Sequence, residues 1–329
     1  MLKYILKRIL LMIPVSFIIS AFVFFLIQLP PGSFLHTKIS IMEAQGATIS
    51  PAEIEQFKQQ FGYDQPIYIQ YLKWIKGFPQ LNFGPAFSYD GKNTWDVISY
   101  YFQNTILLAL LTQCIVLLLG IPIGIYSATH KYSWKDYTIT FLGFIGISIP
   151  GFLLALVLMF VGYKYLNIPG IGGFFSRQFE SAPWSIPKLL DLLKHLWIPV
   201  LVLGAGGLAS NIRVMRGNLL DVLNMHYVQT ARSKGLSERD VIYRHAVPNA
   251  LAPIIMGIGM WLPEILSGAT IISMVLSLPT MGPILVAALK NQDMYLAGTI
   301  LLLQCILLLF GNLIADILLF LVDPRVNFE

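Results

Sequence analysis

The stretch YVQTARSKGLSERDVIYRHAVP, Tyr227–Pro248, is a polar and basic segment between two long apolar runs. It carries four Lys or Arg side chains against two carboxylates, and no apolar run within it is long enough to cross a bilayer. Gly235 divides it into two predicted short helices. The first, Val228–Lys234, ends at this glycine, and the second, Leu236–Arg244, begins with Ser237 as its N-cap.

The residues of this segment leave two interpretations open. A short helix with exposed charges and a few apolar side chains suits a groove on another protein. Alternatively, the segment is a solvated, positively charged connection on the inner side of a membrane. The apolar side chains that the first interpretation uses are Val228, Ala231, Leu236 and Val241.

The rest of the chain indicates a membrane protein. Hydrophobic residues make up 56% of it and charged residues 12%, about half the charged share of a typical soluble domain. Its apolar runs are close to or above the roughly 20 residues that a membrane-spanning helix needs. We therefore expect an all-α, polytopic protein with six transmembrane helices in the runs 9–35, 97–129, 137–163, 196–212, 246–289 and 294–322, of which 196–212 is the shortest.

The positions of Lys and Arg predict the orientation. Lys3, Lys7 and Arg8 precede the first apolar run, which continues past Phe25 without a small-residue cleavage site and is therefore predicted to be a retained helix. With both termini in the cytoplasm, the cytoplasmic segments 1–8, 130–136, 213–247 and 323–329 hold 12 of the 22 basic residues. The net charge of +5 then reflects membrane topology and gives no reason to expect a nucleic-acid partner.

The long segment between the first two helices is predicted to lie outside. It contains an amphipathic stretch, Ser50–Gly62, with Pro51 at the first helical position. The aromatic residues that follow predict either an interfacial belt with a small external cap or a docking face for a soluble partner. They are Tyr68, Tyr71, Trp74, Phe78, Phe83, Phe87, Tyr89 and Trp95.

Small residues predict close helix packing within the membrane. Gly120, Gly124 and Ala128 recur at every fourth position, and the stretch GAGGLAS, Gly204–Ser210, consists almost entirely of small residues. Such faces let helix backbones approach each other where no hydrophobic effect separates helix from lipid.

No pattern in the chain predicts an enzyme. The phosphate-binding GxxxxGK[ST], the HExxH and the GxSxG patterns are all absent from the sequence, and its five histidines are scattered. Cys114 and Cys305 both fall within predicted helices, so neither a disulfide framework nor a metal-ligand spacing is present. We expect the chain itself to bind no cofactor and no metal.

Two acidic residues, Glu264 and Asp316, interrupt apolar runs. A carboxylate within a membrane is costly and usually faces protein or water. Each of the two either hydrogen-bonds a neighbouring helix or, in the case of Glu264, lines a polar translocation path. Pro248, Pro253 and Pro263 predict a bent helix around Glu264, as in helices that line a pathway.

Extended to Pro253, the polar segment reads YVQTARSKGLSERDVIYRHAVPNALAP and resembles the loop YVRTARAKGLSERxVxxRHAxxNAxxP of ABC importer permeases. The resemblance is to the dipeptide/oligopeptide permease family, in its first-permease (B-type) subunit, and it covers essentially the whole chain. Further matching stretches occur in order: KYILKRILLMIPV at Lys3, LPPGSF at Leu29, NTILLAL at Asn104, GIPIGIYSA at Gly120, SIPGF at Ser148, HLWIPVLVLG at His195, RVMRGNLLDVL at Arg213 and LVDPRV at Leu321.

The resemblance implies a type I ABC importer fold, with an N-terminal helix and external region at 1–95 and a core permease domain at 96–329. It implies a coupling loop within 213–247 that fits a groove of an ATPase subunit. The partners implied are a second homologous permease, two ABC ATPase subunits that bind ATP and Mg, an extracytoplasmic solute-binding protein and the lipid of a bacterial-type inner membrane. The coupling residues implied are Gln229, Thr230, Ala231, Arg232, Lys234, Gly235, Leu236, Ser237 and Arg239.

The chain departs from the family pattern after the fifth predicted helix. Ser273 stands at an acidic position, Leu276 at an aromatic one and Thr280 at the first glycine of a PGxG motif. Glu264, Ser273 and Pro150 are the expected residues of a translocation path. The family also imports oligosaccharides and nickel, so the cargo expected is an oligopeptide or an oligosaccharide, nickel being disfavoured by the lack of an external His- or Met-rich cluster. The alternative function is an ATP-independent secondary carrier or channel, which predicts more ionisable groups in mid-membrane than the sequence contains.

Overall fold

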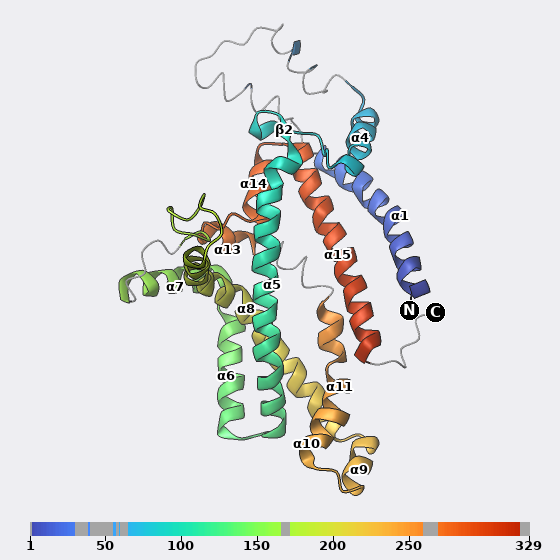
Figure 1. Cartoon of the computed structure of the whole chain (residues 1–329), viewed down its shortest axis with the longest axis vertical. Coiled ribbons are helices and arrows are strands. Elements are labelled where there is room, and N and C mark those ends of the chain that lie inside the picture. Colours follow the sequence, from blue (N-terminus) through green and yellow to red (C-terminus); the bar gives the residue numbers. More distant parts are fainter. Residues whose placement is uncertain are drawn as a thin grey trace. The chain divides into compact units, whose positions relative to one another are not determined.

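The computed structural model describes residues 2–29, 65–165, 172–258 and 269–322, together with the single positions 39, 55, 56 and 59. The described part is predominantly helical, as the sequence predicts (Figure 1). Chain contacts divide it into two compact units, one of residues 1–105 and 280–307 and one of residues 106–279 and 308–329. The amphipathic stretch predicted at Ser50–Gly62 lies outside the described residues, except for positions 55, 56 and 59, which are helical.

The first unit combines the N-terminal part of the chain with the later stretch 280–307, and it contains a small two-stranded sheet. Its strands pair antiparallel, Pro85 opposite Asn93 and Ala86 opposite Lys92. Helices α5 and α15 begin in this unit and continue into the second. The elements are α1 (Leu2–Ile27), α4 (Ile67–Lys76), the 3₁₀ turns η1 (Phe78–Gln80) and η2 (Phe87–Tyr89), β1 (Pro85–Ala86), β2 (Lys92–Asn93), α5 (Thr94–Thr129), α14 (Met281–Lys290) and α15 (Met294–Val322).

Aromatic side chains form the core of this first unit. Trp74 on α4 is 1% exposed, and its ring centroid lies 5.2 Å from that of Phe24 on α1. Four of the eight aromatic residues that could have formed an interfacial belt, Tyr71, Trp74, Phe83 and Phe87, are buried instead. These four side chains therefore pack inside the unit, and the location of the cap outside the membrane stays a prediction.

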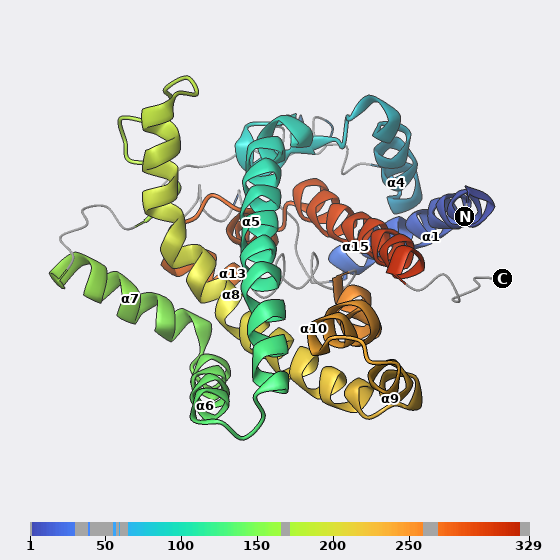
Figure 2. The same cartoon turned by 60° about the horizontal axis from the view of Figure 1, so that its bottom comes forward.

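The second unit carries the long polar segment. Its elements are the remainders of α5 and α15, α6 (Trp134–Ser148), α7 (Gly151–Tyr165), α8 (Ile186–Leu223), α9 (His226–Ser233), α10 (Glu238–Asp240), the π-helix η3 (Val241–Ala246), α11 (Val247–Ala250) and α13 (Thr270–Val275). Helix α8 packs along both α6 and α7 (Figure 2).

Among the residues that the structure describes, four helices are long and apolar enough to cross a membrane: α1, α5, α8 and α15. The predicted third span is broken, because α6 and α7 meet at an angle of 103°. Pro150 causes the break, since a residue before proline avoids the helical conformation and Ile149 is extended, with ψ 123°. The described part of the chain therefore has four candidate spans, or five if the bent pair counts as one, and six spans are not confirmed. Part of the predicted fifth run, 259–268, lies outside the described residues.

Helix α8 is much longer than the 196–212 run that the sequence indicated. It begins at Ile186, ten residues earlier, although Lys188, Asp191 and His195 interrupt the apolar pattern there. These charges have partners in the preceding loop: Lys188 Nζ donates to the Ala182 carbonyl at 2.6 Å, and Asp191 accepts from the Ser176 amide and hydroxyl at 2.7 Å each. A hydropathy pattern registers the charged residues, but it does not show the hydrogen-bond partners that stabilise them.

The predicted small-residue faces are the contact surfaces of α8. A Cβ added at Gly124 of α5 would lie 2.6 Å from Met215 Cβ, and one added at Gly204 of α8 would lie 3.3 Å from Val116. On the other side, Gly143 and Gly146 of α6 face Ala209 and Ala205 of α8. Close helix packing through small residues is thereby confirmed.

Candidate functional site: the polar loop

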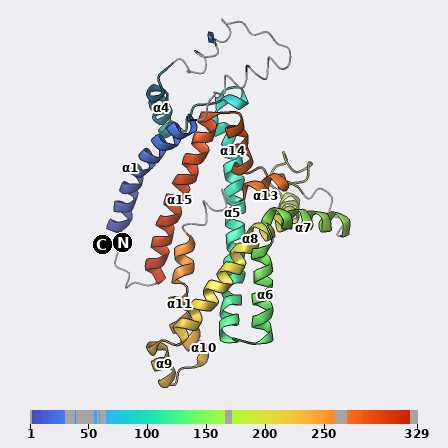
Figure 3. The same ribbon diagram turned by 180° about the vertical axis from the view of Figure 1, so that it is seen from behind.

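The polar loop, residues 226–246, follows α8 directly and consists of α9, a turn at Gly235, α10 and the π-helix (Figures 1 and 3). The two helices predicted around the glycine are both present. Gly235 has a φ of 76°, in the left-handed region that strains any residue with a Cβ. Ser237 is the N-cap of α10, because its Oγ accepts a hydrogen bond from the Asp240 amide at 3.2 Å. The second segment departs from the prediction only in continuing as a π-helix from Val241.

One side of the polar loop is buried against its own chain. Val228 and Val241 are 0% exposed and Ala231 is 5% exposed, in a core shared with Met215 and Leu219 of α8. The prediction that Val228, Ala231 and Val241 would be available to a partner's groove is therefore wrong. Residues of α8 and α5 cover the apolar side of the segment, and the segment's own sequence does not show this contact. Of the four apolar residues, Leu236 stays accessible, at 42% exposure.

A hydrogen bond ties the beginning of the loop to the chain that follows it. Asn249 Nδ2 donates to the Tyr227 hydroxyl at 2.9 Å, and to the His245 carbonyl at 3.1 Å. The loop is thus closed at its base, so that it is a braced projection on α8. The pattern of the sequence gave no signal for this contact, because 22 residues separate the two side chains.

The opposite side of the polar loop is polar and accessible. Gln229 and Thr230 project from α9, and Lys234, Leu236 and Arg239 surround the glycine turn, all exposed. Eight of the nine coupling residues implied by the resemblance therefore lie on the accessible side or at its edge, and Ala231 does not. The eight are Gln229, Thr230, Arg232, Lys234, Gly235, Leu236, Ser237 and Arg239.

Two arginines of the polar loop form ion pairs with carboxylates of the same loop. Arg232 Nε donates to Glu238 Oε1 at 2.9 Å across the glycine turn, and Arg244 lies 3.4 Å from Asp240. Both pairs are solvent-exposed, so each contributes at most about 1 kcal/mol. Within the described residues, Lys234 and Arg239 form no ion pair, and they leave a basic rim on the accessible side.

The expected residues of a translocation path lie in two places. Pro150 starts α7, where its carbonyl accepts from the amides of Leu153 and Leu154. Ser273 lies on α13, 1% exposed. The structure brings their neighbours into contact, since a Cβ on Gly151 would lie 2.7 Å from Ile272 Cδ1. Glu264 lies outside the described residues.

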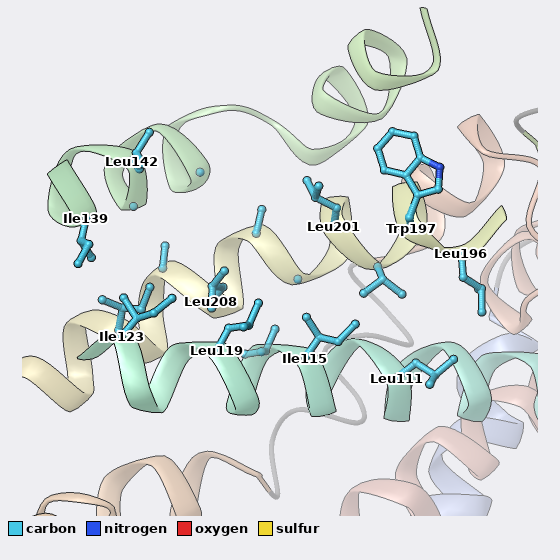
Figure 4. A pocket seen from close by; sticks show the side chains of 18 of the residues that line it. Leu111, Ile115, Leu119, Ile123, Ile139, Leu142, Leu196, Trp197, Leu201 and Leu208 are labelled. Carbon is cyan, nitrogen blue, oxygen red and sulfur yellow. The ribbon is translucent and has the colours of Figure 1, made fainter. Parts of the chain in front are cut away.

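An apolar groove of about 660 Å³ lies between α5, α6 and α8 (Figure 4). Its walls are aliphatic side chains from all three helices, with one tryptophan, Trp197, and glycines and alanines between them. A surface of this kind suits lipid chains or another helix. It offers no charged side chain to a polar solute, so it is a poor candidate for a cargo site.

Comparisons with known proteins match the whole length of the chain. The chain is 34% identical over 328 residues to the oligopeptide transport system permease protein AppB of Bacillus subtilis, covering 100% of both chains. It is 29% identical to the oligopeptide transport system permease proteins OppB of Haemophilus influenzae and of Escherichia coli K12, over 328 and 329 residues and again 100% of each chain. Residues 120–328 match the family model described as binding-protein-dependent transport system inner membrane component, and residues 1–116 match the model for its N-terminal part. With a resemblance that extends over the whole length and includes the polar loop, the chain belongs to the family of binding-protein-dependent transport system inner membrane components.

Proposed function

We propose that the chain is a permease subunit of an ATP-driven importer in the inner membrane, and that it performs no covalent chemistry itself. It pairs with a second homologous permease to enclose the translocation path in a six-span type I fold. Two ABC ATPase subunits, which hold ATP and Mg, dock beneath it in the cytoplasm. An extracytoplasmic binding protein delivers the solute from the other side.

The observation that carries this proposal is the two-sided construction of the polar loop. Its apolar side is packed against α8, with Val228 and Val241 fully buried. Its polar side is free, around a glycine whose positive φ sets the turn. A loop that is fixed to a long helix and accessible on its outer face transmits a push on that face to the helix.

The proposed mechanism is alternating access. ATP binding brings the ATPases together, and the polar loop moves the helices to which it is fixed between two packings. Nucleotide then acts by stabilising one packing more than the other, as any ligand must to shift a conformational equilibrium. Pro150, Ser273 and Glu264 are assigned to the path on this proposal, with the bend at Pro150 supplying a break of the kind found where helices line a cavity.

An oligopeptide is the proposed cargo. Three of the relatives are named oligopeptide transport system permease proteins. The replacements at Ser273, Leu276 and Thr280 remain compatible with an oligosaccharide. Since the binding protein selects the solute on this proposal, its ligand distinguishes the two, and a thermal-shift screen of that protein with peptides and with oligosaccharides identifies it.

The test is the substitution Gly235→Val in the complete transporter. A Cβ at Gly235 meets no atom within 4 Å, so the effect comes from the backbone: φ 76° costs an L-residue about 1–2 kcal/mol, more when it is β-branched. We expect the loop to leave its present turn, uptake to be abolished and ATP hydrolysis to become independent of solute. Membrane insertion should be unchanged.

Gly91→Val is the matched control. Gly91 also has a positive φ, 72°, and also has open space around it, but it lies in the β1–β2 turn of the first unit. It carries the same backbone strain without touching the polar loop, so uptake should persist. Normal uptake by the Gly235→Val variant, or uptake by vesicles that contain this subunit alone and are driven by an ion gradient, would contradict the proposal.

A further inference from the structure

A buried carboxylate joins three helices near the end of the second unit that carries the polar loop. Asp136, in the first turn of α6, has a side chain that is 3% exposed. It accepts two parallel hydrogen bonds from Arg216 of α8, Nε to Oδ1 and Nη2 to Oδ2, each of 2.8 Å. It also accepts a short hydrogen bond from the Ser127 hydroxyl of α5 and one of 3.0 Å from the Tyr132 amide.

These four donors match the roughly four acceptor sites that a carboxylate offers. The group is therefore fully satisfied, and the bidentate geometry of arginine fixes orientation as well as distance. Tyr132, which provides one donor, has a φ of 62°. Such a conformation persists in a non-glycine residue only where the surroundings hold it. The turn between α5 and α6 is thus held around this carboxylate.

Apart from this cluster and the contact of Arg213 with the Phe144 ring, α6 and α8 meet through small residues. Gly143 faces Ala209 and Gly146 faces Ala205, with a Cβ-to-neighbour spacing of 3.5–3.6 Å. Within the described residues, the hydrogen bonds between α6 and α8 are those of Arg216 with Asp136. Small-residue contacts allow close approach but provide little that fixes one helix against sliding along the other. The ion pair provides that restraint.

Arg216 also lies beside the α8 residues against which the polar loop packs. The neighbouring α8 residues Met215 and Leu219 are 0% exposed and belong to the core that holds Val228 and Val241. One turn of α8 therefore contacts the polar loop on one face and Asp136 on another. Figures 1 and 3 show the α5–α6 turn and the polar loop at the same end of this unit.

We propose that Asp136 and Arg216, supported by Ser127, are positioning residues that make α6 move as one body with α8 and the polar loop. The inference rests on the proposed function and deepens it, because it names the contact through which movement of the loop reaches α6 and the bend at Pro150. Without this pair, the loop and α8 still respond to nucleotide, but α6 does not follow.

The experiment uses the complete transporter, with its partners, in vesicles. Arg216→Gln leaves a buried carboxylate without its cation and can prevent folding. The main variant is therefore the double substitution Asp136→Asn with Arg216→Gln, which removes both charges and keeps polar groups of similar size. Arg213→Gln is the matched control. Arg213 lies on the same helix, and its Cζ lies 5.1 Å from the ring centroid of Phe144 on α6, a contact without an ion pair.

Two quantities are measured. The first is the uptake of a radiolabelled tetrapeptide mixture per ATP hydrolysed. This ratio should fall at least fivefold in the double variant, while its ATPase rate is retained. In Arg213→Gln the ratio should stay at the value of the unmodified transporter. The second is the distance between spin labels at Thr138→Cys on α6 and Ser233→Cys on α9, both exposed, with Cys114 and Cys305 replaced by alanine. This distance should be the same with and without ATP in the parent and should broaden or shift with ATP in the double variant.

The proposal is overturned if the double variant keeps both the parent's uptake per ATP and its single distance. It is also overturned if ATP changes the distance in the parent, because α6 would then already move independently of the loop. A double variant that does not assemble, while Arg213→Gln does, would overturn it as well, because the pair would then serve folding alone. Absence of ATP-driven uptake in the parent complex would count against the proposed function. The distance between the spin labels tests the role of the Asp136–Arg216 pair separately.

Discussion

At the scale of single residues, Asp293 shows how one carboxylate fixes the cap of the first unit. It is fully buried and precedes α15, where Oδ1 accepts from the Leu296 amide at 3.3 Å as an N-cap. Its Oδ2 accepts from the Ser88 amide at 2.7 Å, from a turn more than 200 residues earlier in the chain. One side chain thus holds the start of a long helix and the β1–β2 hairpin together.

Asp293→Ala should lower the free energy of unfolding by about 2–3 kcal/mol, because a helix cap is lost and a buried amide is left without an acceptor. Asp293→Asn retains one acceptor oxygen and should restore about half of the loss. Thermal unfolding of the purified protein measures both. Asp96→Ala is the control: Asp96 is exposed in the first turn of α5 and should matter by less than about 1 kcal/mol. Equal losses from the two alanine variants would show that Asp293 does not have this role.

The residues that sequence could identify are those whose role is local. Gly235 and Ser237 were predicted as a turn and an N-cap because both roles depend on adjacent backbone, and both are found. Asp136 and Arg216 gave no such signal, since 80 residues separate them and each alone is one more charge near a membrane edge. The prediction for Val228 is wrong for the same reason: its burial depends on α8, which lies outside the local sequence pattern.

At the scale of helices, hydrophobic periodicity located the apolar segments but not their ends or breaks. The charged first turns of α8 hid its true beginning, because Lys188 and Asp191 are satisfied by a loop that the pattern cannot place. The 103° break between α6 and α7 lies in a run without charged residues that hydropathy predicts as one span, and it occurs at Pro150. The small-residue faces were foreseen, and the structure adds which faces meet.

The contact between α5 and α8 is tighter than that between α6 and α8, and the difference can be tested with one substitution at two places. A Cβ at Gly124 would lie 2.6 Å from Met215 Cβ and 3.0 Å from the Ile212 carbonyl, so Gly124→Ala should destabilise by about 1–3 kcal/mol. A Cβ at Gly143 would lie an ordinary 3.6 Å from Ala209 Cβ. Gly143→Ala should be neutral or stabilising by up to about 1 kcal/mol, because alanine favours the helix.

Thermal unfolding midpoints of the two variants in the same detergent provide the comparison. Both changes add one methyl group to a glycine in an apolar helix, so each is the control for the other. A shift of similar size in both would show that the α5–α8 contact is no tighter than the α6–α8 contact, which contradicts the prediction.

At the scale of the whole molecule, the position of the polar loop relative to the bilayer decides whether it can meet a cytoplasmic ATPase. The distribution of Lys and Arg predicts that the loop and both termini are cytoplasmic and that residues 31–96 are outside. Ser233 on α9 and Lys92 on β2 are exposed representatives of the two sides. In a background with Cys114 and Cys305 replaced by alanine, Lys92→Cys should react with a membrane-impermeant maleimide in intact cells. Ser233→Cys should react only after the membrane is opened, and its labelling in intact cells would place the loop on the side where no ATP-driven partner could reach it.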